Sequence, residues 1–214
     1  MTSVLLTGFE PFGGETTNPS WTTVQKVRDA WRGEALIHAR ELPVAFDRVG
    51  DALRAAIRDT EPDVIICVGQ AGGASTIQVE RIAINVDDAR IPDNTGFQPI
   101  DEPIVPDGPA AYFSSLPIKA AVAAVSALGI PAVVSQTAGT YTCNHVFYQL
   151  MHELEAGHPE SRGGFVHVPF GTDQTAGTDI PSMEIDDMVA AITAIVRATL
   201  ETTVDLKLVG GSLD

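Results

Sequence analysis

The stretch Val64-Ile-Ile-Cys-Val68 is a short apolar run that follows Pro62 and Asp63. Uninterrupted runs of this length are typical of parallel sheets, because their strands are covered on both faces and need no polar side. Comparable apolar segments recur along the chain and give the other expected strands. These are residues 3–6, 77–86, 132–135, 165–168 and 204–209.

Helical patterns separate most of these segments. A first helix is expected after Asn18, which suits an N-cap and precedes Pro19. Ser182 is the expected cap of the last helix. The other expected helices are residues 46–59, 118–128, 144–155 and 183–202. This alternation predicts an α/β fold, a three-layer α/β/α sandwich with a largely parallel or mixed twisted sheet, in a single domain of residues 1–214.

The net charge of the chain limits which partners it can bind, and other features of the sequence indicate its location. The formal net charge is −15, and a surface that acidic repels nucleic-acid phosphates and anionic lipids. We therefore expect neither nucleic acid nor a membrane as a partner. The first residues lack the basic region and the long apolar run of a secretory signal, and no segment reaches the length of a membrane span. With two cysteines in unrelated settings, these features favour a reducing, cytoplasmic location.

Six prolines lie within residues 87–117. Proline removes a backbone donor and fixes φ, so this stretch is excluded from forming a central strand or a long helix. A loop of this length in a compact domain usually has a function or covers something. We expect a lid, a subunit contact, or both.

The two cysteines differ in setting. Cys67 lies inside an expected strand and is interpreted as a small buried apolar residue. Cys143 follows a strand and a small turn that contains Gly139, at the start of an expected helix. The free N–H groups and the dipole of a helix N-terminus stabilise a thiolate and also the oxyanion of acyl transfer. Cys143 is therefore the candidate nucleophile, and the alternative is a buried cysteine that begins a helix by chance.

A catalytic thiol needs a partner that transfers protons, and His167 is the best placed of the five histidines. It ends an apolar strand, and functional groups of α/β sheets gather at the carboxyl ends of strands. His145 is only two residues from Cys143 and would point elsewhere on a helix, so we expect it to fix local structure. The alternative for His167 is a core histidine with satisfied hydrogen bonds.

Glu80 is the candidate for the group that orients the histidine. It interrupts an apolar segment, and a buried carboxylate requires partners. The alternative is a simple ion pair with its neighbour Arg81. No metal site is expected, because paired cysteines and HExxH spacing are absent from the sequence. The segment Gly69-Gln-Ala-Gly-Gly73 matches neither the dinucleotide fingerprint nor the P-loop, so no cofactor is expected.

Five sequence blocks, in the same order and at the same spacing, resemble the pyroglutamyl peptidase I family, whose members are also called pyrrolidone-carboxylate peptidases. The blocks are GFEPFGG with NPSW (residues 8–21), GQAGG (69–73), VERIAINVDDARIPDN (79–94), AGTYTCNHVFY (138–148) and FVHVP (165–169). The resemblance implies a cysteine peptidase that removes N-terminal pyroglutamate from peptides through a thioester, with the triad Cys143, His167 and Glu80. It also implies an α/β/α fold, no metal, and a homo-oligomer, a tetramer or dimer.

The resemblance further implies four substrate-binding residues. Phe9 and Phe12 would flank the flat lactam ring, which fits an aromatic slot because pyroglutamate carries no amino-terminal charge. The backbone around Gln70 would hydrogen-bond the lactam or the scissile carbonyl. Arg90 would lie near the active site and help to hold the oxyanion region.

The sequence departs from the family pattern at three places. Ala74 stands where arginine is usual, Gln136 stands where asparagine is usual, and residues 170–173 replace an aromatic-Leu-Pro segment. We expect these changes to affect substrate affinity and the pocket rim but not the triad. Two other functions compete with this one: a phosphate-binding enzyme that resembles a nucleoside phosphorylase, and a binding module that has lost turnover. The intact Cys, His and Glu argue against both.

Overall fold

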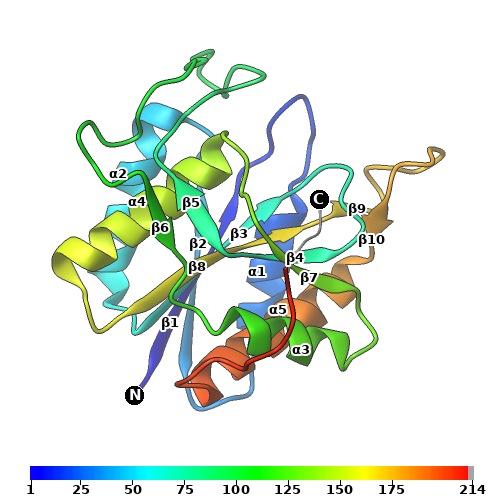
Figure 1. Ribbon diagram of the computed structural model, residues 1–214. Coiled ribbons are helices and arrows are strands. Elements are labelled where there is room, and N and C mark those ends of the chain that lie inside the picture. Colours follow the sequence, from blue (N-terminus) through cyan, green and yellow to red (C-terminus); the bar gives the residue numbers. More distant parts are fainter. Residues whose placement is uncertain (212–214) are drawn as a thin grey trace.

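The computed structural model describes residues 1–211 of the 214-residue chain. Helices and strands alternate along it (Figure 1). The strands are β1 (Ser3–Phe9), β2 (Leu36–Leu42), β3 (Val64–Gln70), β4 (Ile77–Glu80), β5 (Ile82–Ile84), β6 (Ala111–Phe113), β7 (Ala132–Ser135), β8 (Arg162–Val168), β9 (Phe170–Gly171) and β10 (Ser182–Met183). The helices are α1 (Pro19–Ala30), α2 (Phe46–Thr60), α3 (Ile118–Ser126), α4 (Thr142–Gly157) and α5 (Ile185–Glu201).

The main sheet has the strand order β2-β1-β3-β8-β4-β7. Strands β2, β1, β3 and β8 are parallel to one another. Strand β4 is antiparallel to β8 and parallel to β7, so the last two strands run in the reverse direction. The predicted mixed, largely parallel sheet is therefore confirmed.

Helices cover both faces of this sheet. Figure 1 shows α1, α3 and α5 on one face, where α5 packs against the other two, and α2 and α4 together on the opposite face. The predicted three-layer arrangement is confirmed. Two hydrophobic cores result, one on each side of the sheet.

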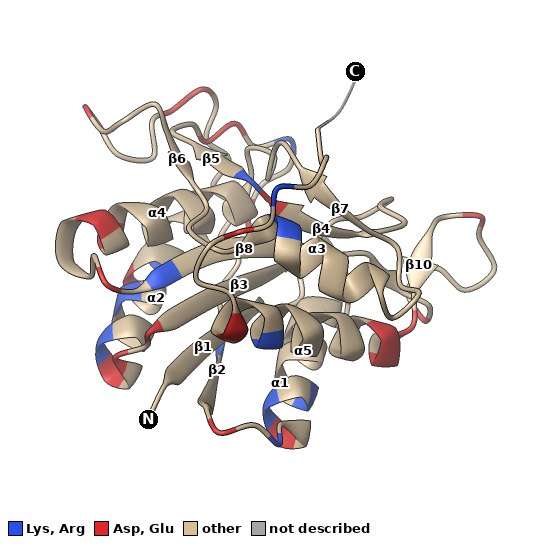
Figure 2. Cartoon of the chain, turned by 60° about the horizontal axis from the view of Figure 1, so that its bottom comes forward, with Lys and Arg blue, Asp and Glu red and all other residues tan. Residues whose placement is uncertain are grey.

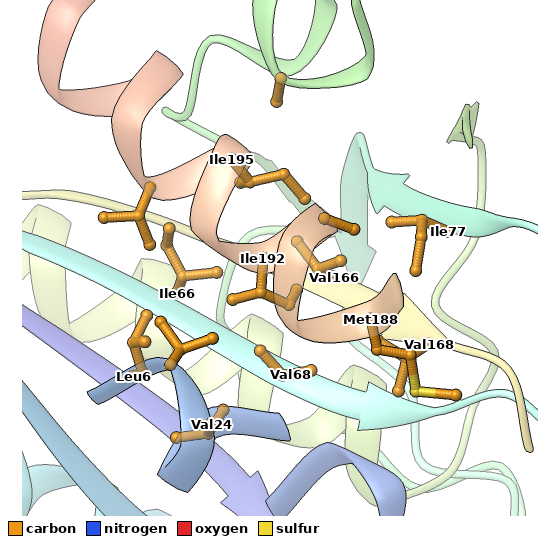
Figure 3. Close-up of a cluster of buried hydrophobic side chains, with 14 of the residues drawn as sticks. Leu6, Val24, Ile66, Val68, Ile77, Val166, Val168, Met188, Ile192 and Ile195 are labelled. Atoms are coloured by element: carbon orange, nitrogen blue, oxygen red, sulfur yellow. The ribbon is translucent and has the colours of Figure 1, made fainter. Parts of the chain in front are cut away.

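Alternation along each strand decides which core a side chain enters. In β3, Ile66 and Val68 point toward α1 and α5, whereas Cys67 points toward α2 and α4. In β8, Val166 lies in the same core as Ile66, and Phe165 lies in the same core as Cys67. Figure 3 shows the first core, in which strand residues meet side chains of α1 and α5. Its labelled residues are Leu6, Val24, Ile66, Val68, Ile77, Val166, Val168, Met188, Ile192 and Ile195.

The expected strand at residues 77–86 is wrong in its extent. Strand β4 ends at Glu80, and beyond Arg81 the chain leaves the main sheet to form a small antiparallel pair of β5 with β6. The Arg81 side chain turns outward, and its Nε donates to Gln136 Oε1 at 2.9 Å. The change of direction follows Glu80, the residue that interrupts the apolar segment.

The expected strand at residues 204–209 is also wrong, since this tail belongs to none of the sheets. Its Asp205 has another role, because the carboxylate accepts the backbone N–H groups of Lys119 and Ala120 at 3.0 and 2.9 Å. These are donors of the first turn of α3, so the tail supplies the cap that Pro117 cannot provide.

The two predicted helix caps had different outcomes, and one edge strand was missed. The predicted cap Asn18 is confirmed, because its side chain accepts the Ser20 N–H at 3.1 Å. The predicted cap Ser182 is wrong, since it lies in β10 and α5 follows Glu184. Strand β2 was not expected, because as an edge strand it mixes polar residues with apolar ones.

The proline-rich stretch has the predicted lack of long regular structure. Between residues 87 and 117 only the three-residue β6 is a strand, and no helix forms there. The charged residues are spread over helices and loops around the molecule, with acidic positions prominent on the loops (Figure 2). Within residues 1–211, no helix has both the length and the apolar character needed to cross a membrane.

Candidate active site

His167 and Glu80 meet where the central parallel strands end. His167 is the next-to-last residue of β8, and Glu80 is the last residue of the adjacent antiparallel strand β4. His167 Nδ1 lies 2.7 Å from Glu80 Oε1, and Glu80 is fully buried. A carboxylate at this position fixes the orientation of the ring and leaves its Nε2 available to a reacting group.

Cys143 approaches this pair from the helical layer formed by α2 and α4. It is the second residue of α4, whose N-cap is Tyr141. The sulfur lies close to β3, because a Cβ built on Gly69 would be only 2.8 Å from Cys143 Sγ. Glycine at position 69 therefore makes room for the thiol. Cys143 and His167 line the same cavity, as expected for a nucleophile and its proton-transfer partner.

The electrostatics of the pair favour a protonated histidine. Burial by itself lowers the pKa of His167, but the facing Cys143 sulfur and the Glu80 carboxylate reverse this and raise it to about 10. The ring is then an imidazolium that can stabilise a thiolate. The other thiol has the opposite environment, because burial raises the pKa of Cys67 to about 12. The prediction that Cys67 is a buried apolar residue is confirmed by its zero exposure.

The cavity beside Cys143 has a volume of about 360 Å³ and mostly apolar walls. Aromatic rings form much of the lining, since Phe9, Phe12 and Tyr141 all contribute. The centroids of the Phe12 and Tyr141 rings are 6.0 Å apart. No Asp, Glu, Lys or Arg lines this cavity within the described part of the chain. Such a slot suits a small, flat, uncharged group.

The loop that carries the two phenylalanines is held by hydrogen bonds. The Phe9 N–H donates to Ser20 Oγ at 3.0 Å, which ties the end of β1 to α1. Glu10 Oε1 accepts the Val44 N–H at 2.9 Å and Asn94 Nδ2 at 2.8 Å. One carboxylate thus joins three loops at the rim, so the aromatic walls have a defined position.

Of the two remaining predicted substrate-binding residues, Gln70 lies at the catalytic cavity and Arg90 does not. Gln70 lines the catalytic cavity, and its Oε1 accepts Gln174 Nε2 at 3.0 Å. Arg90 does not line that cavity but a neighbouring one of about 380 Å³. The structure therefore brings together Cys143, His167 and Glu80 with the aromatic loop, and leaves Arg90 at the next cavity.

Sequence reasoning missed several residues of the site, Gln78 among them. Val44 and Tyr141 line the catalytic cavity, and Gln174 fixes the side chain of Gln70. Tyr141 could have been found, because it stands two residues before Cys143 in the block that carries the nucleophile. Burial, the nearby Asp93 carboxylate and the Cys143 sulfur raise the pKa of Tyr141 to about 12, so it stays neutral. Val44 and Gln174 gave no signal in the sequence.

His145 takes part in a second buried pair. Its Nδ1 lies 2.7 Å from Asp87 Oδ2, and Gln149 contacts the other ring nitrogen at 3.2 Å. The contact joins α4 to the proline-rich stretch. Asn144 adds a contact with the neighbouring strand β5, because its Nδ2 donates to the Ile84 carbonyl at 2.9 Å. His145 thus has the local structural contacts expected of it.

The family departures fall at the edges of the site. Gln136 bonds Arg81 and lines a groove beside β7 and the tail, away from the catalytic cavity. Ala74 lies in the turn after β3, where its N–H donates to the Ala71 carbonyl at 3.2 Å. Phe170 lines the neighbouring cavity, and its ring fills the space that a Cβ on Gly72 would need.

Fold and site together place the chain among the α/β cysteine hydrolases, since a helix-terminal thiol faces a buried histidine–carboxylate pair. The family model described as Pyroglutamyl peptidase matches residues 2–202. A pyrrolidone-carboxylate peptidase of Clavibacter michiganensis is 67% identical over 214 residues, which is 100% of both chains. The chain belongs to the pyroglutamyl peptidase family, and the predicted class, a cysteine peptidase specific for pyroglutamate, is confirmed.

Solved structures agree with this assignment. The crystal structure of pyroglutamyl peptidase I of Bacillus amyloliquefaciens superposes with a TM-score of 0.93 at 47% identity, over 96% of this chain and 100% of that one. The pyrrolidone carboxyl peptidase of Thermococcus litoralis gives 0.90 at 40% identity, over 94% of each chain. The predicted fold is therefore confirmed.

Proposed function

We propose that Cys143, His167 and Glu80 form the catalytic triad with which this chain, as one peptidase domain of residues 1–214, removes N-terminal pyroglutamate from peptides. One observation carries the assignment of residues. The fully buried Glu80 holds His167 at 2.7 Å, at a cavity that Cys143 also lines.

The reaction proceeds in two halves. The Cys143 thiolate attacks the carbonyl carbon of the pyroglutamyl residue, and a C–S bond forms. As the peptide C–N bond breaks, the His167 imidazolium gives its proton to the leaving amine. Water then attacks the thioester while His167 takes its proton. The C–S bond breaks, pyroglutamate leaves, and the thiolate–imidazolium pair is restored.

The start of α4 supplies the oxyanion site. The first N–H groups of a helix have no partner within the helix, and Cys143 is the second residue of α4. These donors and the helix dipole lie beside the sulfur, where negative charge develops on the carbonyl oxygen. Arg90 lines the neighbouring cavity, and this proposal places it beside the leaving part of the substrate.

The apolar cavity provides specificity for the lactam. Phe9 and Phe12 form walls against the flat ring, and the segment at Gln70 offers hydrogen bonds to its amide. An ordinary peptide would bring a charged ammonium group into this cavity. Because none of the described side chains lining it carries a compensating carboxylate, the desolvation cost disfavours such a peptide.

The test uses the release of aminomethylcoumarin from its pyroglutamyl amide. Cys143→Ala should abolish release, because no other residue at the cavity can form the thioester. Cys67→Ala is the matched control and should keep most of the activity, since Cys67 is buried in the core. Retention of activity in Cys143→Ala would overturn the proposal.

Location and assembly are also part of the proposal. Both cysteines are free, and the mechanism needs a reduced Cys143, so we place the protein in the cytoplasm. We expect a homo-oligomer, a tetramer or dimer. It is supported by apolar side chains exposed on edge strand β7 and on the tail beside it, namely Val133, Leu206 and Leu208. Light scattering coupled to gel filtration would test it.

A further inference from the structure

A second cavity adjoins the catalytic one. Its volume is about 380 Å³, and it shares three lining residues with the catalytic cavity: Phe12, Gln70 and Tyr141. Cys143 and His167 line only the catalytic cavity. If the lactam fills the catalytic cavity, the scissile bond lies at the sulfur, and the chain beyond it continues past the shared wall. The second cavity is then the adjoining space into which the residue after pyroglutamate would extend.

The second cavity differs from the first in charge. Its lining residues include Glu15, Asp88 and Arg90, whereas no Asp, Glu, Lys or Arg of residues 1–211 lines the catalytic cavity. All three residues are exposed. None of the ion pairs formed within residues 1–211 involves any of them. Two carboxylates and one guanidinium thus remain free to meet a ligand.

The backbone under these charges is fixed. The Asp88 N–H donates to the Thr140 carbonyl at 2.9 Å, and Thr140 Oγ1 donates to the Asp88 carbonyl at 2.7 Å. Asp88 also follows Asp87, which is paired with His145 of α4. In the aromatic loop, the Glu15 N–H donates to the Phe12 carbonyl at 3.2 Å. The carboxylates therefore project from positions set by the catalytic helix and by the aromatic loop.

From this geometry we propose that the second cavity binds the residue that follows pyroglutamate, and that Glu15 and Asp88 make it favour a cationic side chain over an acidic one. The inference rests on the proposed function, because it needs the lactam in the first cavity. Arg90 opposes the preference, but one guanidinium faces two carboxylates. The net charge of −15 acts in the same direction by repelling anionic peptides.

The experiment compares kcat/KM for three dipeptide amides: pyroglutamyl-lysine, pyroglutamyl-alanine and pyroglutamyl-glutamate. Exposed charge pairs are weak, so the lysine-to-glutamate ratio should be about 5- to 10-fold at low ionic strength. It should approach unity at about 1 M salt, where the Debye length is about 3 Å. A ratio near unity at low salt, or one that favours glutamate, would overturn the proposal.

Charge variants locate the effect. Glu15→Gln combined with Asp88→Asn should bring the ratio close to unity, and Arg90→Gln should increase it. The matched control is Glu34→Gln, a carboxylate in a different cavity at the opposite end of the sheet, which should leave the ratio unchanged. If the lysine-to-glutamate ratio fell equally in Glu34→Gln, the preference would come from the overall charge of the protein. That result would contradict the role proposed for the second cavity.

Failure of the two proposals gives different results. If the pyroglutamyl aminomethylcoumarin substrate is not hydrolysed either, the proposed function is wrong and this inference falls with it. If that substrate is hydrolysed but the three dipeptides show no charge preference, only the assignment of the second cavity is wrong.

Discussion

Glu80 Oε1 lies 2.7 Å from His167 Nδ1, while Glu80 Oε2 is buried and has no hydrogen-bond partner within residues 1–211. The carboxylate charge therefore depends on the histidine for its stabilisation. A buried charge without compensation is costly, so the imidazolium form of His167 stabilises Glu80 as much as Glu80 stabilises it. The same contact decides the orientation of the ring and the protonation state that catalysis uses.

Glu80→Gln should lower kcat/KM by about 10²- to 10⁴-fold, because the amide keeps the shape but supplies no negative charge to hold the imidazolium. Since Glu80 raises the His167 pKa, its loss should also move the alkaline limb of the pH–rate profile to lower pH. Both effects can be measured with the pyroglutamyl aminomethylcoumarin substrate. Glu184→Gln, an exposed carboxylate at the start of α5, is the control. An unshifted alkaline limb in Glu80→Gln would contradict the assigned role.

The free energy of unfolding should fall as the pH rises above neutrality. The folded-state pKa of His167, about 10, exceeds the ordinary value of 6.5, so the folded protein holds this proton more tightly than the unfolded chain. The resulting stabilisation is complete below the ordinary value and is lost as the pH rises through the folded-state pKa. Urea denaturation between about pH 7 and about pH 10 should show the decline, and His167→Gln should flatten it. If the free energy of unfolding declined equally with pH in the unchanged protein and in His167→Gln, His167 would not be the cause of the decline.

Gly69→Ala should impair catalysis more than its size suggests. The added Cβ would lie 2.8 Å from Cys143 Sγ and 2.7 Å from Phe165 Cζ, so either the sulfur or the ring must move. A shift of the nucleophile by a fraction of an ångström lowers kcat, because the reacting atoms no longer align. Gly157→Ala is the control, since nothing lies within 4 Å of the position that its added Cβ would take. Equal kcat values for both variants would show that the close approach at Gly69 is unimportant.

Much of this site follows from alternation along strands, which the sequence displays. His167 must share a face with Phe165, and Glu80 must lie opposite to Val79. The reversed direction of β4 could not be predicted in this way, because side-chain alternation is the same in both directions. The break at Arg81 was also hidden, since it depends on contacts with Gln136 and with β6, which are distant in the sequence.

The hydrogen bonds at the rim of the catalytic cavity could not be predicted from the sequence. Glu10 joins Val44 to Asn94, and Gln174 holds Gln70, through single hydrogen bonds between loops. Such contacts leave no periodic pattern, and loop residues of these types are equally common where they bind nothing. The helix-terminal position of Cys143 was predictable because a strand, a glycine turn and an apolar helix repeat lie next to it in the chain.

His145→Ala should destabilise the protein by about 3 kcal/mol, because it leaves the Asp87 carboxylate buried without its partner. The double variant His145→Ala, Asp87→Ala should lose less than the sum of the two single variants, since neither buried polar side chain is then left without its partner. Chemical denaturation of the four proteins measures the coupling. Additive losses would show that the 2.7 Å contact contributes nothing beyond its separate parts.

Thiol alkylation should distinguish the two cysteines at neutral pH. Iodoacetamide reacts with thiolates, and burial raises the pKa of Cys67 to about 12, so this thiol stays neutral as well as inaccessible. Cys143 is partly exposed, lines the cavity and faces the His167 imidazolium. Peptide mass mapping should therefore find one modified residue, Cys143, and its modification should proceed in parallel with the loss of activity. Glu80→Gln should slow the modification because the imidazolium is less stable, whereas modification of Cys67 in the folded protein would contradict the burial on which this selectivity depends.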